Sequence, residues 1–153
     1  MIARASQLFL PTLRDDPADA EAVSHKLLVR GGFIRQVAAG LWTFTPLGWR
    51  AHRKVEQIIR EEMDAIGAQE WLAPVLTPAE LWKATGRYEI PELFKLEDRS
   101  GRPFVLPMSH EETFTFHARE IQSYRELPHS WYHFQTKDRD ERKIGRASCR
   151  ERV

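Results

Sequence analysis

The sequence predicts an α+β fold in which an antiparallel β-sheet is flanked by helices. Three observations support this prediction. Helical and strand patterns are mixed without the regular β-α-β alternation of a parallel sheet. The residues at 98–101, Asp-Arg-Ser-Gly, have hairpin-turn chemistry and separate two apolar segments. Residues 46–66 carry apolar side chains at steps of three and four, which form one stripe along a helix.

The N-terminal part of the chain predicts one helix followed by a short turn and a strand. The helical pattern begins near Ala18 and stops at Gly31 and Gly32. A turn is expected over residues 33–39. Residues 41–44, Leu-Trp-Thr-Phe, are rich in the aromatic and branched residues that strands favour.

The helix over residues 46–66 has clear signals at both of its ends. Thr45 can cap its N-terminus, and Pro46 occupies the first helical position, where a missing N–H costs nothing. Gly67 terminates it. Because these signals mark both of its ends, this helix is the most strongly predicted element of the chain.

The remainder of the chain predicts shorter elements. Residues 69–76 read as a buried strand that Pro74 interrupts, because proline cannot donate to a sheet ladder. Residues 77–80 and 109–112 have the form of capping boxes, each followed by a helix. Residues 131–137 read as another strand.

The composition indicates a single globular domain. The chain has 153 residues, of which 42% are hydrophobic and 29% charged, with a net charge of +1. This balance excludes a disordered or collagen-like chain and lacks the basic excess of many nucleic-acid-binding domains. No apolar run is long enough to span a bilayer, and no secretory signal is recognisable. With one cysteine and therefore no internal disulfide, the chain is expected to be cytoplasmic.

Most catalytic motifs are missing from the sequence. Neither glycine-rich phosphate loop occurs, and no serine or cysteine lies in a nucleophile elbow. His110 and Glu111 begin like a zinc-protease helix, but Phe114 stands where the second histidine is needed. The six histidines are scattered, so no metal site is expected. What is left is catalysis by positioning and electrostatics.

Several segments are distinctive in combination, in their order and spacing over residues 5–143. They are residues 6–14 (Ser-Gln-Leu-Phe-Leu-Pro-Thr-Leu-Arg), 40–48 (Gly-Leu-Trp-Thr-Phe-Thr-Pro-Leu-Gly), 60–76, 80–87, 107–112 (Pro-Met-Ser-His-Glu-Glu) and 135–141 (Gln-Thr-Lys-Asp-Arg-Asp-Glu). Together they resemble the beginning of bacterial-type prolyl-tRNA synthetases, which are class II aminoacyl-tRNA synthetases. The resemblance implies that residues 1–143 are the N-terminal part of the catalytic domain, with the first class II motif and the first strand of the second.

The resemblance also implies a proline site. Residues 107–112 are similar to the family's T-x-E loop, in which a hydroxyl and a carboxylate two residues apart meet the charged secondary amine of proline. These positions are Ser109 and Glu111, and serine stands where the family usually has threonine. The alternative interpretation is that Ser109 and Glu112 only cap a helix.

The second motif implies an ATP site. By resemblance, Arg139 holds the α-phosphate of ATP and is the catalytic residue, while Glu141 faces the adenine amino group. Mg²⁺ accompanies ATP, and the activated proline passes to tRNA(Pro). Asp138 departs from the family, which usually has phenylalanine there. The alternative interpretation of residues 139–143 is a solvated charge run.

The family is dimeric through the first motif, which corresponds to the helix 46–66 and the strand 69–76. Basic residues crowd the N-terminal half of this helix and acidic residues its C-terminal half. Antiparallel packing on a second copy would pair the two halves, so a homodimer is expected. A plain solvated face explains the same charges.

Residues 144–153 (Ile-Gly-Arg-Ala-Ser-Cys-Arg-Glu-Arg-Val) have no apolar period, and they match the translation of a common sequencing-library adapter. We expect them to be a non-native tail of a truncated gene, and the chain alone to be inactive. Three alternatives stay open. They are another class II synthetase, such as a threonyl or seryl enzyme; a non-catalytic class II-like dimerisation or nucleic-acid-binding protein; and a generic α+β interaction domain.

Overall fold

The computed structural model describes residues 4–18, 20 and 22–140. The chain divides into two compact units. The described residues up to Glu61 belong to the first unit, and those from Glu62 onward belong to the second. In the described part of the chain, no helix is both long and apolar enough to cross a membrane.

The first unit begins with a short 3-10 turn, η1 (Ala5–Gln7), and the helix α1 (Val23–Arg30). The predicted helix is confirmed, but it begins at Val23 rather than near Ala18. It ends as predicted, because Gly31 closes the last turn and Gly32 has a φ of 73°, which glycine adopts without steric cost.

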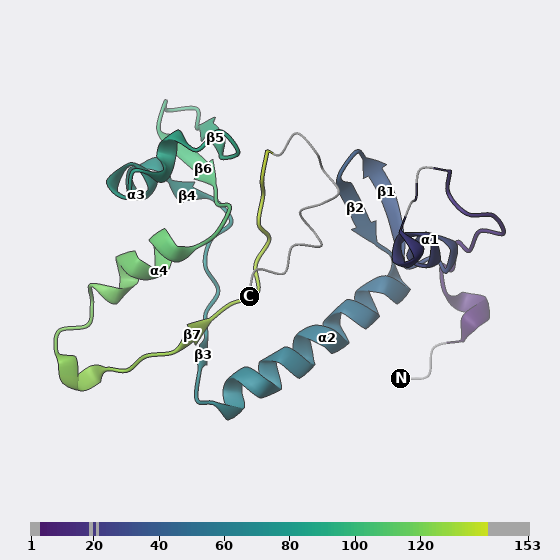
Figure 1. The fold of residues 1–153 in the computed structure, drawn as a ribbon, viewed down its shortest axis with the longest axis horizontal. Coiled ribbons are helices and arrows are strands. Elements are labelled where there is room, and N and C mark those ends of the chain that lie inside the picture. Colours follow the sequence, from purple (N-terminus) through teal and green to yellow (C-terminus); the bar gives the residue numbers. More distant parts are fainter. Residues whose placement is uncertain (1–3, 19, 21, 141–153) are drawn as a thin grey trace. The chain divides into compact units, whose positions relative to one another are not determined.

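The strands β1 (Ile34–Ala38) and β2 (Leu41–Phe44) form an antiparallel hairpin (Figure 1). The predicted strand at 41–44 is therefore confirmed, and the turn predicted over 33–39 is wrong. The turn lies instead at Ala39 and Gly40, where Gly40 has a φ of 74°. A short strand needs a partner for its backbone groups, and the preceding segment supplies it.

The helix α2 (Pro46–Ala65) follows the sequence prediction closely. The amide of Gly48 donates a hydrogen bond to the Thr45 hydroxyl at 3.4 Å, so Thr45 does cap the helix. Gly67 follows its C-terminus with a φ of 79°. The apolar stripe is largely exposed: Ile58, for example, retains 61% of its accessible surface.

Gly48 lies in close contact with the backbone of Phe33 in the first unit. It is buried, and a Cβ atom added to it would overlap the carbonyl oxygen of Phe33. That oxygen also accepts the amide hydrogen of Thr45 at 2.9 Å, so it cannot easily move. We expect Gly48→Ala to lower the free energy of unfolding by about 2–3 kcal/mol, measured by guanidinium titration.

Gly67→Ala is the matched control for this prediction. A Cβ atom at Gly67 meets nothing within 4 Å, and only its positive φ opposes the change. We expect it to cost about 1–2 kcal/mol. A smaller loss at Gly48 than at Gly67 would contradict the overlap with Phe33.

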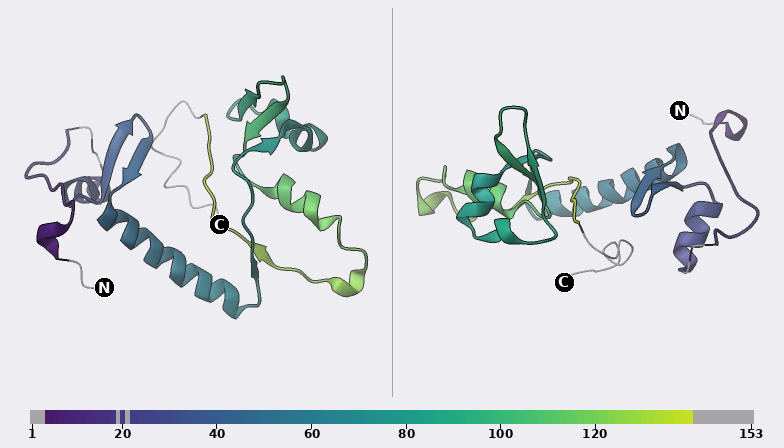
Figure 2. Two further views of the ribbon diagram at one scale, coloured as in Figure 1. Left: turned by 180° about the vertical axis from the view of Figure 1, so that it is seen from behind. Right: turned by 90° about the horizontal axis from the view of Figure 1, so that it is seen from above.

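The second unit contains a three-stranded antiparallel sheet in the order β4 (Thr77–Pro78), β6 (Pro103–Leu106), β5 (Phe94–Glu97). The hairpin predicted between residues 94 and 106 is confirmed. The helix α3 (Ala79–Ala84) lies beside this sheet in Figure 1 and in both views of Figure 2. A 3-10 turn, η2 (Arg87–Glu89), follows it.

The core of the second unit lies between α3 and this sheet. It consists of Ala79, Trp82, Leu93 and Val105, each less than 5% exposed. The capping box predicted at 77–80 is wrong, because Thr77 belongs to β4 and the residue before α3 makes no side-chain cap. The Thr77 hydroxyl instead accepts a hydrogen bond from the indole N–H of Trp82 at 3.2 Å, within the core.

The second unit also contains α4 (Glu111–Ala118), a 3-10 turn η3 (Tyr124–Glu126), and the short parallel pair β3 (Gln69–Glu70) and β7 (Trp131–Tyr132). The other strand pairs are antiparallel, so the α+β prediction is confirmed.

Both longer strands predicted in this region are wrong in extent. In each of the segments 69–76 and 131–137, only the first two residues form a strand pairing. Gln69 and Glu70 are exposed rather than buried. The ladder stops ahead of Pro74, which cannot donate to it.

Candidate functional site

The loop that joins β6 to α4 and the first residue of α4 hold the two residues predicted to bind proline, Ser109 and Glu111. Pro107 and His110 anchor the loop, since Pro107 is fully buried and His110 is 3% exposed. The helix that follows begins at Glu111, and His110 at its N-terminus makes no side-chain cap. The helix-cap interpretation of Ser109 and Glu112 is therefore wrong, and both side chains have tertiary partners.

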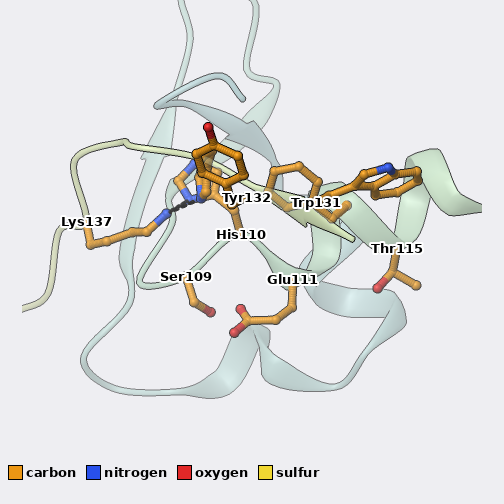
Figure 3. A pocket seen from close by; sticks show the side chains of 9 residues that line it. Ser109, His110, Glu111, Thr115, Trp131, Tyr132 and Lys137 are labelled. Carbon is orange, nitrogen blue, oxygen red and sulfur yellow. Dashed lines mark hydrogen bonds between the residues drawn. The ribbon is translucent and has the colours of Figure 1, made fainter. Parts of the chain in front are cut away.

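Ser109 and Glu111 line one hollow of about 430 Å³ at the start of α4. Figure 3 shows the hydroxyl and the carboxylate pointing toward one another. Partial burial raises the pKa of Glu111, but the Ser109 hydroxyl, the backbone amide and the charges of Arg87 and Lys137 outweigh it. The pKa of Glu111 is therefore below its usual value, and the carboxylate is ionised at neutral pH.

Arg87 organises this loop, a role that no sequence pattern predicted. Its guanidinium donates to a carboxylate oxygen of Glu112 at 2.7 Å and to the Ser109 hydroxyl at 3.2 Å. It also lies 3.7 Å from a carboxylate oxygen of Glu111 and 5.0 Å from the ring centroid of Trp82. One rigid fork of donors thus contacts three polar side chains at the start of α4, at positions 109, 111 and 112.

Glu112 points away from solvent. Its side chain is only 2% exposed, and the oxygen bound by Arg87 also accepts from the Thr85 hydroxyl at 3.3 Å. Its second oxygen is buried without a hydrogen-bond partner in the described part of the chain. Glu112 therefore depends on Arg87, because a buried carboxylate without a cation is costly.

Lys137 lies on the other side of the hollow, where sequence analysis had assigned no function. Its amine contacts Nδ1 of His110, as Figure 3 shows, and lies 2.8 Å from Nε2 of His133. Burial and the nearby charge of Arg139 lower the pKa of Lys137 to about 8, although Glu111 acts in the opposite direction.

The segment that carries Lys137 is fastened to the rest of the second unit by its neighbours. The side-chain amide of Gln135 donates to the carbonyl of Ala73 at 2.8 Å. The backbone amide of Asp138 donates to the carbonyl of Pro107 at 3.4 Å. Residues 135–138 therefore run alongside the loop that holds Ser109.

Arg139 meets the same loop from outside the hollow. Its guanidinium donates to the carbonyl of Met108 at 3.5 Å, one residue before Ser109, but Arg139 does not line the hollow. Glu141 and the tail at 144–153 lie outside the described residues. The structure thus brings Ser109 and Glu111 together and puts Arg139 at their edge.

The side chains of the hollow suit a small molecule that carries one positive and one negative group. A carboxylate lies at one side and the amine of Lys137 at the other, with the guanidinium of Arg139 just outside the hollow. Apolar rings of Phe114 and Trp131 complete the lining. Within residues 4–18, 20 and 22–140, no group of three or more His, Cys, Asp or Glu residues could hold a metal ion.

The ring of His133 makes the stability of this region depend on pH. Burial and the charges of Lys137 and His110 lower the pKa of His133 to about 4. Between about pH 6.5 and pH 4 the unfolded chain binds a proton here that the folded chain does not, so stability falls as the pH falls. We expect a loss of about 1 kcal/mol from pH 7 to pH 5, allowing for the partial exposure of the ring.

His133→Asn should remove most of this loss, whereas His129→Asn, on the exposed segment before β7, serves as control. Guanidinium titrations at the two pH values provide the measurement. An unchanged pH dependence in His133→Asn would rule out this residue as the cause.

Comparisons with known proteins confirm the resemblance found in the sequence. The chain is 59% identical to "Proline--tRNA ligase" of Acidithiobacillus ferrooxidans and 56% identical to that of Anaeromyxobacter sp. (strain K), each over 90% of this chain. It is 49% identical to that of Caldicellulosiruptor saccharolyticus over 97% of this chain. The chain spans only about a quarter of the length of these relatives (25%, 25% and 27%). No family model matches it.

Solved structures show the same fold. A prolyl-tRNA synthetase from Cryptosporidium parvum, complexed with L-proline and AMP, matches with a TM-score of 0.66 and 16% identity, over 77% of this chain and 24% of that one. The RNA binding domain of a threonyl-tRNA synthetase from the same organism matches with a TM-score of 0.64 and 24% identity, over 69% of this chain and 27% of that one. The fold of the chain is that of class II aminoacyl-tRNA synthetase domains.

Proposed function

Because the chain is similar to proline–tRNA ligases over nine-tenths of its length, we propose that it is the N-terminal part of such a ligase. The observation that supports this most directly is the pair of Ser109 and Glu111 in one hollow, with an ionised carboxylate and a hydroxyl in contact. Residues 1–143 are then part of the catalytic domain.

The proposed substrate fits the charges of the hollow. The secondary ammonium group of proline binds the carboxylate of Glu111 and the Ser109 hydroxyl through charge-assisted hydrogen bonds. Its five-membered ring would pack on the apolar lining supplied by Phe114 and Trp131. The proline carboxylate is left facing the basic side.

The proposed reaction is formation of prolyl-adenylate followed by transfer to tRNA(Pro). An oxygen of the proline carboxylate attacks the α-phosphorus of ATP in line and displaces pyrophosphate. Arg139 stabilises the negative charge that builds up on the non-bridging oxygens of the α-phosphate, and the carboxylate of Glu141 accepts a hydrogen bond from the adenine amino group. Mg²⁺ would be held through the phosphates of ATP and would add positive charge to them. A ribose hydroxyl of the tRNA then takes the prolyl group.

We further propose that the whole ligase is a cytoplasmic homodimer. Support comes from the exposed apolar residues of α2 and the segment after it, which a second copy would cover: Val55, Ile58, Ile59, Ile66 and Leu72. The charge order of α2, basic then acidic, suits an antiparallel partner.

Pyrophosphate exchange tests the function. The product of the uninterrupted gene should exchange pyrophosphate into ATP with proline and not with threonine or serine, which separates it from other class II enzymes. The 153-residue chain alone should give no exchange, since it spans a quarter of its relatives. Exchange that depends on threonine would refute the proline assignment.

A further inference from the structure

Three nitrogen atoms of the second unit converge at the basic side of the hollow, and the proposed ligase reaction uses only the charge of one of them, the amine of Lys137, and no covalent chemistry at any of them. The amine of Lys137 lies between Nδ1 of His110 and Nε2 of His133, whose ring centroids are 4.6 Å apart. The two rings meet edge to face, at 73°. An amine held by two imidazoles differs from the usual surface lysine, whose amine is free in water.

The hydrogen bonds of His110 define which atom faces the lysine. Nε2 of His110 lies 2.9 Å from the carbonyl oxygen of Pro74, and a carbonyl can only accept. Nε2 therefore carries the hydrogen, and Nδ1 of the neutral ring presents a lone pair to the amine of Lys137. The ring is buried, and burial lowers the pKa of His110, which favours this neutral form.

The charged groups around Lys137 shift its pKa in opposite directions. Burial lowers its pKa most, the guanidinium of Arg139 lowers it further, and the carboxylate of Glu111 raises it. The net pKa of about 8 leaves roughly a quarter of the amine unprotonated at pH 7.5, against about a thousandth for an ordinary lysine. Lys137 as a whole is exposed, so a reagent in the hollow can reach the amine.

We propose that Lys137 is a covalent acylation site, whose amine is acylated by mixed carboxylic–phosphoric anhydrides that enter the hollow. The cluster of two imidazoles and the opening of the hollow carry this inference. It does not require the chain to be a ligase, although the acyl-adenylate of the proposed reaction belongs to the same chemical class. Acylation would replace a cation at the basic side by a neutral amide.

The chemical step is a simple acyl transfer. The lone pair of the Lys137 amine attacks the acyl carbon, and a nitrogen–carbon bond forms. The bond between that carbon and the phosphate oxygen breaks, and the phosphate leaves with the electron pair. The proton lost by the nitrogen passes to Nδ1 of His110 and from there to solvent. Nothing is oxidised or reduced.

Acetyl phosphate is the probe for this proposal. The folded 153-residue chain is incubated with it at pH 7.5, and acetyl groups on each lysine are followed by peptide mass spectrometry. We expect Lys137 to react about tenfold faster than the exposed Lys54, because its larger share of free amine outweighs its lower basicity. In guanidinium chloride, which unfolds the chain, the difference should disappear.

Two variants give opposite results if the geometry is right. Glu111→Gln removes the carboxylate that favours the protonated amine and should speed acetylation of Lys137. Arg139→Gln removes a cation and should slow it. Equal rates at Lys137 and Lys54 in native buffer would overturn the proposal, and so would an excess at Lys137 that persists in guanidinium chloride. Because the readout is an acetyl group, absence of ligase activity has no bearing on the outcome.

Discussion

Arg87→Ala should reduce the free energy of unfolding by about 3–5 kcal/mol, because it leaves the buried carboxylate of Glu112 without its cation. The Glu112 side chain is 2% exposed, and its nearest cationic atom is the Arg87 nitrogen at 2.7 Å. The Thr85 hydroxyl, at 3.3 Å, is a weak substitute. Since whole domains are stable by only about 5–15 kcal/mol, guanidinium titration of this variant should show a marginal fold.

A matched control separates burial from mere ion pairing. Arg102 and Asp98 form a shorter ion pair, at 2.6 Å, but the Arg102 side chain is 73% exposed. Arg102→Ala should therefore cost less than about 1 kcal/mol. The double variant Arg87→Ala/Glu112→Leu, which carries no buried charge, should recover much of the loss. Equal costs at Arg87 and Arg102, or no recovery in the double variant, would contradict the argument.

Helix α2 shows what local sequence signals can predict. Its cap, its first-turn proline, its apolar stripe and its terminal glycine all act within a few residues of one another. The structure accordingly begins the helix at Pro46 and ends it at Ala65, close to the predicted 46–66. The hairpin between β5 and β6 is the same case, because Asp98 accepts amide hydrogens from Ser100 and Arg102 inside the turn itself.

The two capping boxes show where the same signals fail. Each has the right residues at the right spacing, but a partner outside the capping box binds the side chain. Thr77 accepts the indole hydrogen of Trp82 in the core, and Glu112 pairs with Arg87, 25 residues earlier in the chain. A tertiary contact of this kind outweighs a helix cap, which is worth about 1 kcal/mol. Local sequence patterns do not predict such a contact.

The candidate site divides in the same way. Ser109 and Glu111 were predicted by resemblance, as neighbours within one loop, and they do line one hollow. Arg87, His110, His133 and Lys137 were not predicted, because they come from three separate segments that only the fold brings together. The separation of 27 residues between His110 and Lys137 carries no chemical signal by itself.

Glu111→Gln should raise the KM for proline of the uninterrupted ligase by about tenfold to a hundredfold, since a charge-assisted hydrogen bond is worth about 1.5–3 kcal/mol. The substitution keeps the size of the side chain and removes the charge that, in the proposed function, binds the secondary ammonium group of proline. Because the carboxylate faces the amine, the KM for ATP should change little. Proline-dependent pyrophosphate exchange measures both constants.

Variants of Ser109 test whether this residue binds proline directly or only stabilises the fold of the loop. Ser109→Thr keeps the hydroxyl from which Glu111 accepts a hydrogen bond, so its KM for proline should be close to that of the parent. Ser109→Ala should raise the KM for proline, but less than Glu111→Gln does, because only a neutral hydrogen-bonding group is lost. Glu120→Gln, just beyond the end of α4, removes an exposed carboxylate and should leave both constants unchanged. If Glu111→Gln raised the KM for ATP as much as that for proline, the carboxylate would be acting through the fold of the loop rather than through the amine of the substrate.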